Sequence, residues 1–424
     1  MKVLVISAAY PPLHAGEATN SLFLCRYLAD RKLDVHVLTS QENVGTGDSG
    51  ISVHPIMRHW SWLEIPRFRA FLKICAPDAI LLMYLGLMYH YHPMVTFTPT
   101  IAKRLFPRVP FVSRFENVAL SADPARMSWV SRAFRKLAVQ QWAGRNEVSY
   151  SFGTLLRDSD QIIALCKRHR TCLLDENPGV GPKTELIPPP PNMRICKGGD
   201  EARQRQREKL GVRSDDFVIA FLGYIYPAKG VETLLRAFQI VMSRKIHVKL
   251  LFIGGKFGVD SVDSDGKGSY VEQMYTLSKQ LGLEPNTIWT GAFKAEDEEG
   301  SLNLQAADVG VFTFVKGVQL NNSSFSSMAA HGLPMIATRG PWLDEPFVHQ
   351  ENVLLCEPND PFALAQSILL VMESSGLRER LRKGALKLAS EWFSWDRATD
   401  RTIDLLQGRR SCRETNESKT AGHV

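Results

Sequence analysis

The segment from Phe312 to Thr338 combines two predicted strands with a polar loop and a short helix, expected over Phe325–Ala330, between them. The first N–H groups of a helix have no partner within the helix, and together with the helix dipole they attract an anion such as a phosphate. The groups expected to face such an anion belong to Asn322, Ser323 and Ser324. An ordinary capped helix has the same pattern, so this segment leaves both interpretations open.

A lysine occupies a similar position in the run Gly223–Gly230, between a predicted strand and a predicted helix. The positive charge of Lys229 at a helix start is unfavourable unless an anion compensates for it, and a diphosphate would do so. Near the N-terminus, the loop Tyr10–Glu17 contains Gly16, which allows the backbone to approach a ligand closely. The alternatives are a solvated lysine at a turn and a plain connecting loop.

Length and composition restrict the class of protein. A chain of 424 residues with 44% hydrophobic content is too long for one core and suits two domains. No apolar run approaches the ~20 residues of a membrane span, and the N-terminus enters a predicted strand without room for a signal peptide. The seven cysteines include no CxxC pair, which argues against a disulfide framework and a zinc site. We therefore expect a soluble protein of a reducing cytoplasm.

Two distant stretches open in the same way, with a short apolar run, a loop, an amphipathic helix and a second apolar run. Such runs, alternating with helices, are typical of parallel strands that are buried on both faces. The stretches comprise Val3–Ile6, Asn20–Arg31 and Val35–Leu38, and then Val218–Leu222, Val231–Met242 and Val248–Ile253. The predicted fold class is α/β with two Rossmann-like domains, each binding ligands at the carboxyl ends of its strands. Neither stretch contains GxGxxG, which disfavours a dinucleotide-dependent redox enzyme.

The boundary between the two domains is expected at Ile187–Gly199. Four consecutive prolines, Pro188 to Pro191, make this segment extended and stiff. The expected domains are residues 1–190 and 191–385. The polar tail over residues 409–424 is expected to be disordered.

The order of these elements resembles the retaining glycosyltransferases of family four, which have the GT-B fold of two Rossmann-like domains facing across a cleft. The loop Tyr10–Gly16 is similar to the family's PP and Gly-Gly loop, and Gly223–Gly230 is similar to its GRxxPxKG element. Gln319–Thr338 is similar to its Glu-x7-Glu element and the EAMAxGxPVVAT-like run. Further similar segments are Pro77–Met83, Asp160–Ile163, Ala307–Val309 and Phe393–Trp395.

The resemblance implies transfer of a sugar from a nucleotide-sugar donor to a glycan, lipid-linked or small-molecule acceptor, with retention of configuration and without a cofactor. It assigns acceptor binding to residues 1–190 and donor binding to 191–385, with a C-terminal helix over 386–408 crossing back to the first domain. The implied donor-binding residues are Gly16, Gly223, Tyr224, Lys229, Gln319, Asn321, Asn322, Ser323 and Ser327.

The sequence departs from the family pattern at several of these positions. Gln319 stands at the first glutamate of the motif and Ser327 at the second, and Tyr224 replaces an arginine. Gln319 can hydrogen-bond sugar hydroxyls but cannot accept a proton, and Ser327 is short for a bidentate ribose contact. One glycine of the N-terminal pair is Ala15. A bacterial branch without the double-glutamate motif has a similar pattern, with an arginine pair at the positions of Asn321 and Asn322.

Sugar transfer requires stabilisation of the leaving diphosphate. Lys229 and the amides at the helix start could provide it without a metal. Two DxD patterns, Asp158–Asp160 and Asp263–Asp265, could suggest a metal site, but we interpret both as turns. In this family, front-face attack with the leaving phosphate as proton acceptor needs no enzyme base, which agrees with Gln319. The implied catalytic residues are Lys229, Gln319 and Glu116.

Glu116, after a predicted strand, is the carboxylate best placed in the first domain to contact the acceptor or the donor sugar. The alternative is a helix-start cap paired with Arg114. His14 is a second, weaker candidate for acceptor binding, because it lies in a loop beside a strand end.

The net charge of +7 is partly concentrated in residues 103–145, where a predicted helix carries basic residues and two tryptophans. Such a helix suits an anionic membrane surface, which would place the protein at the inner face of the membrane. Alternatively, its aromatic side chains pack on the sheet and its basic residues are solvated. No nucleic-acid-binding motif accompanies the charge. A catalytically weak GT-B scaffold that binds a sugar nucleotide or a partner protein is the second functional hypothesis.

Overall fold

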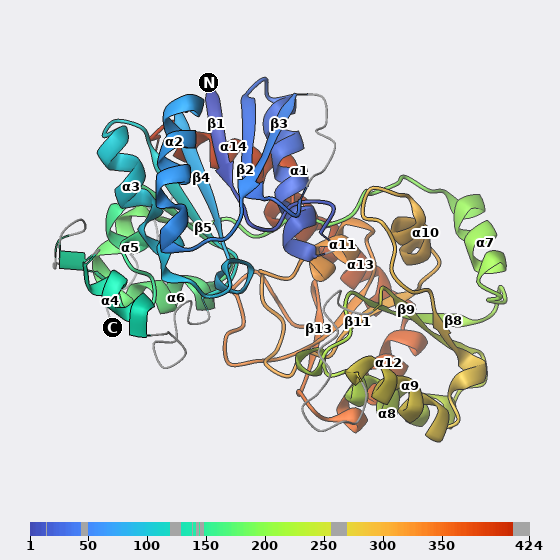
Figure 1. Ribbon diagram of the computed structural model, residues 1–424. Helices are drawn as coiled ribbons and strands as arrows, with labels where there is room; N and C mark the ends of the chain where they lie inside the picture. The colour runs from blue at the N-terminus through green and yellow to red at the C-terminus, as the bar shows by residue number, and fades with distance from the viewer. Residues whose placement is uncertain are drawn as a thin grey trace, which may run out of the picture. The chain divides into compact units, whose positions relative to one another are not determined.

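The computed structural model describes residues 1–13, 15–43, 50–118, 129–137, 139–140, 144, 148–255 and 269–409. The chain divides into two compact units. The first comprises Met1–Leu13, Asn20–Ile187 and the chain from Trp395 onward. The second comprises Pro188–Ser394 and a short segment that ends at Thr19. Each unit is built around its own parallel sheet (Figure 1).

The sheet of the first unit has the strand order β3-β2-β1-β4-β5-β6-β7, and every neighbouring pair is parallel. Its inner strands are nearly all apolar, because helices cover both faces of a parallel sheet. The strands are β1 Lys2–Ile6, β2 Asp34–Ser40, β3 Ile51–Met57, β4 Ala79–Tyr84, β5 Phe111–Phe115, β6 Gln161–Ala164 and β7 Thr184–Leu186.

Two hydrophobic clusters cover the two faces of this sheet. One includes Phe68 and Phe111, and the other includes Leu24, Val112 and Trp395. The helices are α1 Gly16–Asp30, α2 Ile65–Cys75, α3 Thr98–Leu105, α4 Trp129–Leu137, α5 Leu155–Asp158, α6 Lys167–Glu176 and α14 Trp395–Leu406, with short 3₁₀ helices η1 Trp62–Glu64, η2 Gly86–Tyr89, η3 Pro93–Phe97 and η5 Pro178–Lys183.

Helix α14 packs on α1 within the first unit. The Trp395 ring stacks on Tyr27 with a centroid distance of 5.0 Å. Arg31 pairs with Asp396 at 2.7 Å and with Asp400 at 3.1 Å. The last described helix is therefore part of the first unit, although α12 (Pro361–Glu373) and α13 (Ser375–Trp392) before it belong to the second.

The sheet of the second unit has the order β10-β9-β8-β11-β12-β13, again with parallel neighbours. Its strands are β8 Phe217–Leu222, β9 Val248–Ile253, β10 Thr287–Trp289, β11 Val309–Phe312, β12 Met335–Thr338 and β13 Leu354–Cys356. Its helices are α7 Asp200–Lys209, α8 Val231–Met242, α9 Tyr270–Gln280, α10 Glu299–Gln305, α11 Ser323–Ala330, α12 Pro361–Glu373 and α13 Ser375–Trp392, with 3₁₀ helices η6 Pro227–Lys229 and η7 Glu284–Asn286.

The predicted fold class, two parallel Rossmann-like sheets, is confirmed. Some predicted bounds differ from those observed. Helix α1 begins at Gly16 instead of Asn20, and α11 begins at Ser323 instead of Phe325. The earlier start of α11 follows from its cap, because the Asn322 side chain accepts a hydrogen bond from the Phe325 N–H at 3.4 Å. The polar tail from residue 410 lies outside the described residues.

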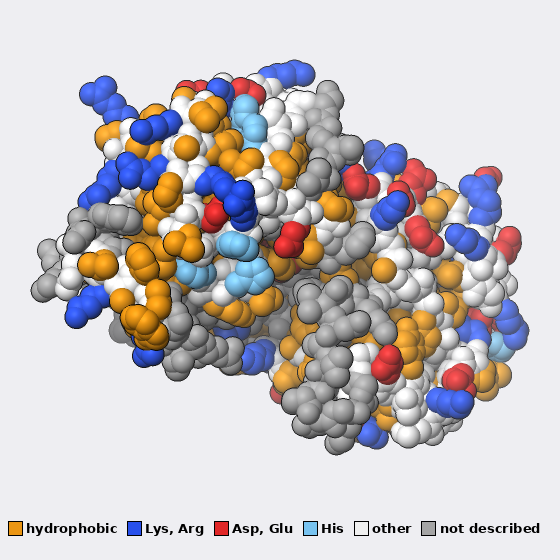
Figure 2. All heavy atoms as spheres, in the orientation of Figure 1, with side chains coloured by type: hydrophobic (Ala, Val, Ile, Leu, Met, Phe, Trp, Pro, Cys, Tyr) orange, Lys and Arg blue, Asp and Glu red, His pale blue; other side chains and the backbone are white. Residues whose placement is uncertain are grey.

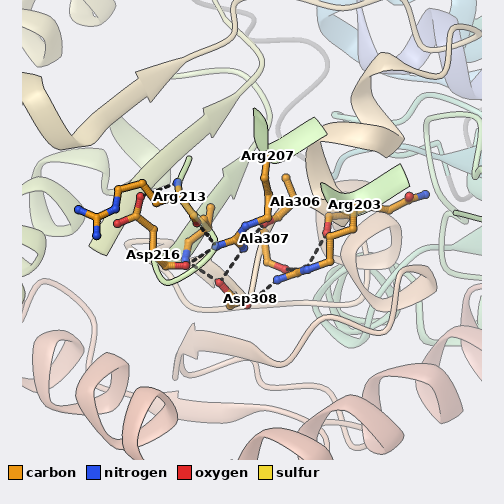
Figure 3. A network of polar contacts seen from close by, with 9 residues as sticks. Arg203, Arg207, Arg213, Asp216, Ala306, Ala307 and Asp308 are labelled. Carbon is orange, nitrogen blue, oxygen red and sulfur yellow. Dashed lines mark hydrogen bonds and ion pairs between the residues drawn. The ribbon is translucent and has the colours of Figure 1, made fainter. Parts of the chain in front are cut away.

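At the amino ends of β8 and β11, arginines of α7 fix the helix to the sheet (Figure 3). Arg203 pairs with Asp308 at 2.6 Å. Arg207 is 4% exposed, contacts Asp308 at 3.4 Å and donates to the carbonyl oxygens of Ala306 and Asp216. The Asp308 carboxylate also accepts from the Val218 N–H at 2.7 Å. Buried charges at this edge are therefore paired and hydrogen-bonded.

Replacement of Arg207 by methionine is expected to lower the free energy of unfolding by about 3 kcal/mol, because it leaves several buried acceptors without a donor. The urea midpoint followed by tryptophan fluorescence measures the change. Arg213→Met is the matched control. Arg213 is 64% exposed and pairs with exposed Asp215, so its replacement is expected to change the free energy of unfolding by less than about 1 kcal/mol. Equal effects of the two variants would contradict this account of the network.

Candidate functional site

The carboxyl ends of β8 and β11 bring the lysine loop and the start of α11 together. Gly223 follows β8 with a φ of +123°, which favours glycine. A Cβ at this position would lie 2.9 Å from Ser324 Oγ and 3.7 Å from Lys229 Nζ. The ammonium group and the first turn of α11 thus both lie beside the backbone of Gly223.

A second glycine fixes the lysine loop to the chain that follows β11. Gly230 has a φ of +63°, and a Cβ there would lie 2.0 Å from the carbonyl oxygen of Thr313. The Thr313 hydroxyl donates to the Lys229 carbonyl oxygen at 2.7 Å, and the Val315 N–H donates to the Ala228 carbonyl oxygen at 3.1 Å. The position of the Lys229 backbone therefore depends on contacts with the end of β11.

The Lys229 side chain is buried, with 7% exposure, among aromatic rings. Its Nζ lies 4.4 Å from the ring centroid of Phe314 and 5.6 Å from that of Tyr226. Over the described ranges, no carboxylate or other acceptor is paired with this ammonium. Burial lowers the pKa of Lys229 to about 8. A buried cation with only cation–π partners is able to pair with an anion.

The N-terminus of α11 provides N–H groups beside this cation. Ser323 and Ser324 are the first two helical residues, and their N–H groups have no acceptor within the helix. The Ser323 hydroxyl accepts a hydrogen bond from Asn192 Nδ2 at 3.2 Å, and the same amide donates to the Gly16 carbonyl oxygen at 3.0 Å. Gly16, at the start of α1, therefore belongs to the same cluster within the second unit.

The remaining predicted donor residues are buried to different degrees. Gln319 is 7% exposed in the segment between β11 and α11, and Asn321 and Asn322 are partly exposed in the same segment. Tyr224 follows Gly223, and burial together with the Glu17 carboxylate raises the pKa of its phenol. Ser327 is 2% exposed, and its hydroxyl donates to the Ser323 carbonyl oxygen at 2.7 Å. The Ser327 hydroxyl is thus bound to its own helix.

The predicted acceptor residues belong to the first part of the chain. Glu116 follows β5 in the first unit, and Arg114 Nε lies 2.7 Å from Glu116 Oε1. The pairing with Arg114 that the alternative interpretation required is present. His14 lies outside the described residues.

Acidic side chains of the first DxD pattern pair with basic neighbours. Asp158 pairs with Arg157 at 2.6 Å and Asp160 pairs with Lys103 at 2.6 Å. The second pattern, Asp263–Asp265, lies outside the described residues. Within the described part of the chain, one group of three potential ligands is close enough for a metal: Asp215, Asp216 and His247. It precedes β8 and β9 and so lies at the edge of the sheet opposite Lys229.

Hydrophobic side chains of α4 are exposed instead of packed on the sheet. Trp129 is 76% exposed, Phe134 is 46% exposed and Leu137 is 47% exposed. Figure 2 shows hydrophobic side chains at the surface in the region of α4. For these residues the alternative interpretation, packing on the sheet, is wrong. None of the helices that the structure describes has the length and apolar character needed to cross a membrane.

The sequence did not predict the part that three residues play in this cluster. Asn192 follows the proline run and carries no motif, and Ser324 was expected to contribute only its N–H. Phe314 lies two residues after Phe312, and the two rings stack with a centroid distance of 5.9 Å. Because side chains two residues apart on a strand share a face, the sequence could have placed Phe314 on the same face as Phe312. No pattern within the sequence links Phe314 to Lys229.

Residues 202–388 match the family model described as "Glycosyl transferases group 1". This region is therefore similar to group 1 glycosyltransferase domains. The chain is 28% identical over 201 residues to the uncharacterized glycosyltransferase MJ1607 of Methanocaldococcus jannaschii, covering 47% of each chain. It is 28% identical over 208 residues to the D-inositol 3-phosphate glycosyltransferase of Xylanimonas cellulosilytica, covering 48% of this chain and 45% of that protein. The match spans about half the length of these curated relatives.

Solved structures are similar in fold to nearly the whole chain. HepE of Anabaena superposes with a TM-score of 0.68 at 18% identity, covering 96% of this chain and 100% of HepE. The chain therefore has the GT-B fold. The group 1 domain and the glycosyltransferase relatives support a transferase enzyme. The group 1 domain contains Lys229, Gln319 and α11.

Because folding lowers the pKa of Lys229 from 10.5 to about 8, the charged lysine destabilises the folded chain below pH 8. The lowered pKa corresponds to a destabilisation of the folded chain by about 3 kcal/mol. Replacing the lysine also removes its cation–π contacts, which stabilise the folded chain by about 1 kcal/mol. Lys229→Met is therefore expected to raise the free energy of unfolding at pH 7 by about 2 kcal/mol. This gain shrinks as the pH rises from 8 to 10.5, where the unfolded chain also loses its proton.

Urea unfolding at a series of pH values measures this dependence. Lys245→Met in the same unit is the control, because Lys245 forms an exposed ion pair with Glu373. A Lys229→Met protein less stable than the parent at pH 7 would show that the ammonium is compensated.

Proposed function

We propose that the chain is a glycosyltransferase that uses a nucleoside diphosphate sugar. The observation that carries this proposal is the buried Lys229 ammonium beside the first N–H groups of α11, within a group 1 domain. When the bond between the sugar and the diphosphate breaks, negative charge accumulates on the leaving diphosphate. A fixed cation and helix N–H groups stabilise that charge more strongly than they stabilise the bound donor.

A uridine nucleotide is the first donor to test. HepE, which shares the fold, was crystallised with UDP and glucose and with UDP-glucose. In the proposed division of roles, residues 191–385 bind the donor, residues 1–190 bind the glycan, lipid-linked or small-molecule acceptor, and the helix within 386–408 completes the first domain.

The proposed donor contacts include the lysine loop, the start of α1 and the segment before α11. They come from Gly16, Gly223, Tyr224, Lys229, Gln319, Asn321, Asn322, Ser323 and Ser327. The Ser327 hydroxyl would first have to release its hydrogen bond to Ser323. Glu116 and His14 are the proposed acceptor contacts, and Glu116 is also proposed as a catalytic residue that contacts the donor sugar.

We propose that transfer retains the configuration of the sugar. The acceptor hydroxyl attacks the anomeric carbon from the side of the leaving group, the bond to the diphosphate breaks, and the acceptor proton passes to the leaving phosphate oxygen. Gln319 holds sugar hydroxyls in this step, because an amide donates and accepts hydrogen bonds but does not take a proton. No metal ligand is required.

The alternative, a catalytically weak scaffold that binds a sugar nucleotide, differs in one measurable property. A transferase usually hydrolyses some donor without an acceptor, whereas a scaffold does not. The comparisons favour the transferase. Contact of residues 103–145 with an anionic membrane, and hence a location at its inner face, stays a prediction.

Lys229→Met is expected to weaken UDP binding and to lower kcat/KM for UDP-glucose hydrolysis about 10- to 150-fold, because a charge-assisted contact worth about 1.5–3 kcal/mol is lost. Calorimetric titration with UDP and a hydrolysis assay, both in EDTA, measure the two effects. Lys245→Met serves again as the control and is expected to match the parent. Unchanged binding and turnover in Lys229→Met would refute the proposed diphosphate site.

Gln319→Ala is expected to lower kcat/KM for UDP-glucose about 5- to 30-fold, the loss of a neutral hydrogen bond worth about 1–2 kcal/mol. Gln319→Glu keeps the shape and the acceptor oxygens, so its activity should remain near that of the parent. Steady-state hydrolysis of UDP-glucose compares the three proteins. An alanine variant as active as the parent would remove Gln319 from the sugar site.

A further inference from the structure

Arg114 is among the largest fully buried side chains, with 0% exposure. It lies on β5 between Val112 and Glu116, and residues two apart on a strand point to the same face. Val112 belongs to the cluster covered by α1 and α14, so the arginine lies beneath these helices in the first unit. A guanidinium in this position needs an explanation, because arginine is rarely buried without a partner.

The guanidinium is held from two sides. Nε lies 2.7 Å from Glu116 Oε1, and Nη2 donates to Asn20 Oδ1 of α1 at 2.9 Å. Nη1 and Nε are both buried and make no hydrogen bond among the described residues, so the contact between Nε and Glu116 Oε1 is an ion pair. A buried ion pair is often no more stabilising than apolar side chains of similar volume, and an unsatisfied donor adds a cost. Stability therefore does not account for an arginine at this position.

Glu116 extends past the end of β5, at the carboxyl edge of the sheet. Its backbone N–H donates to the Tyr84 carbonyl oxygen at 2.9 Å, so the backbone is fixed as well as the carboxylate. Oε1 is buried against the guanidinium, whereas the side chain as a whole remains 10% exposed. The exposed fraction therefore belongs to other atoms of Glu116. A carboxylate held in one orientation by one oxygen can accept hydrogen bonds from sugar hydroxyls through the other.

We propose that Arg114 is a positioning residue for the transfer reaction: its guanidinium, fixed by Asn20 of α1, orients the Glu116 carboxylate toward the hydroxyls of the bound sugar. This inference rests on the proposed function and deepens it. The ion pair with Arg114 is the means by which Glu116 acts, and Arg114 itself does not touch the substrate.

A double-mutant cycle in UDP-glucose hydrolysis tests the proposal. Arg114→Met and Glu116→Gln are each expected to lower kcat about 10- to 100-fold, the scale of a misplaced contact group. The double variant should be no slower than the slower single variant, because Arg114 acts only through Glu116. Arg114→Lys, which keeps the charge, should recover a large part of kcat. Losses that multiply in the double variant, or a kcat of Arg114→Met within about twofold of the parent, would overturn the proposal.

Arg207→Met is the matched control, since it also removes a buried arginine but lies at the amino edge of the other sheet. It should lower the urea midpoint without the loss in kcat. If Arg114→Met does not fold, Asn20→Ala takes its place in the cycle. That change removes the second contact of the guanidinium and should cost about 3- to 10-fold in kcat only while Glu116 is present.

Crystal structures of Arg114→Met and Arg114→Lys provide a measurement that does not depend on turnover. The Glu116 carboxylate is expected to leave its position in Arg114→Met and to keep it in Arg114→Lys. If Asn20→Ala replaces Arg114→Met, the Glu116 carboxylate is expected to shift in the Asn20→Ala protein. An unmoved Glu116 would overturn the positioning role. Failure of the parent protein to hydrolyse or bind any nucleotide sugar would count against the proposed function, and the position of Glu116 would still decide the role of Arg114.

Discussion

The proposed donor site of the second unit depends on one constraint: the Lys229 ammonium is buried and has no counterion among the described residues. Lys229 is 7% exposed, and its Nζ lies 4.4 Å from the ring centroid of Phe314 and 5.6 Å from that of Tyr226. The free-energy cost of that burial must be met by the surrounding fold, here by the backbone contacts of the lysine loop with Thr313 and Val315. Such an arrangement is destabilising in the empty protein and favourable once an anion binds.

Charged groups are paired differently at the two edges of the second unit's sheet. At the amino ends of β8 and β11, Arg207 and Asp308 satisfy each other and several carbonyl oxygens. At the carboxyl ends, the Lys229 ammonium and the first N–H groups of α11 find no charged partner among the described residues. This division agrees with the rule that ligands of parallel α/β sheets bind at the carboxyl ends of the strands.

Local patterns were sufficient for much of the fold. Strand β9 and helix α8 have the bounds expected from apolar runs and helical periodicity, because each of these elements buries a face that its own sequence defines. The lysine loop could be identified for a similar reason, since the two glycines that fix it are visible in the sequence. Contacts between distant segments could not be predicted. Asn192 reaches Ser323 across 131 residues, and no local preference specifies such a pair.

Two of the buried cations that the structure describes, Arg114 and Lys229, show why each residue type suits its position. A guanidinium stays charged in proteins, so Arg114 can be buried only where a carboxylate, here Glu116, remains beside it. An ammonium can give up its proton, so Lys229 tolerates an unpaired position, with its pKa lowered to about 8 by burial. An arriving diphosphate would favour the charged form again, and binding above pH 8 would take up a proton. Lysine is therefore suited to a position that is alternately empty and filled by an anion, and arginine to one that is always paired.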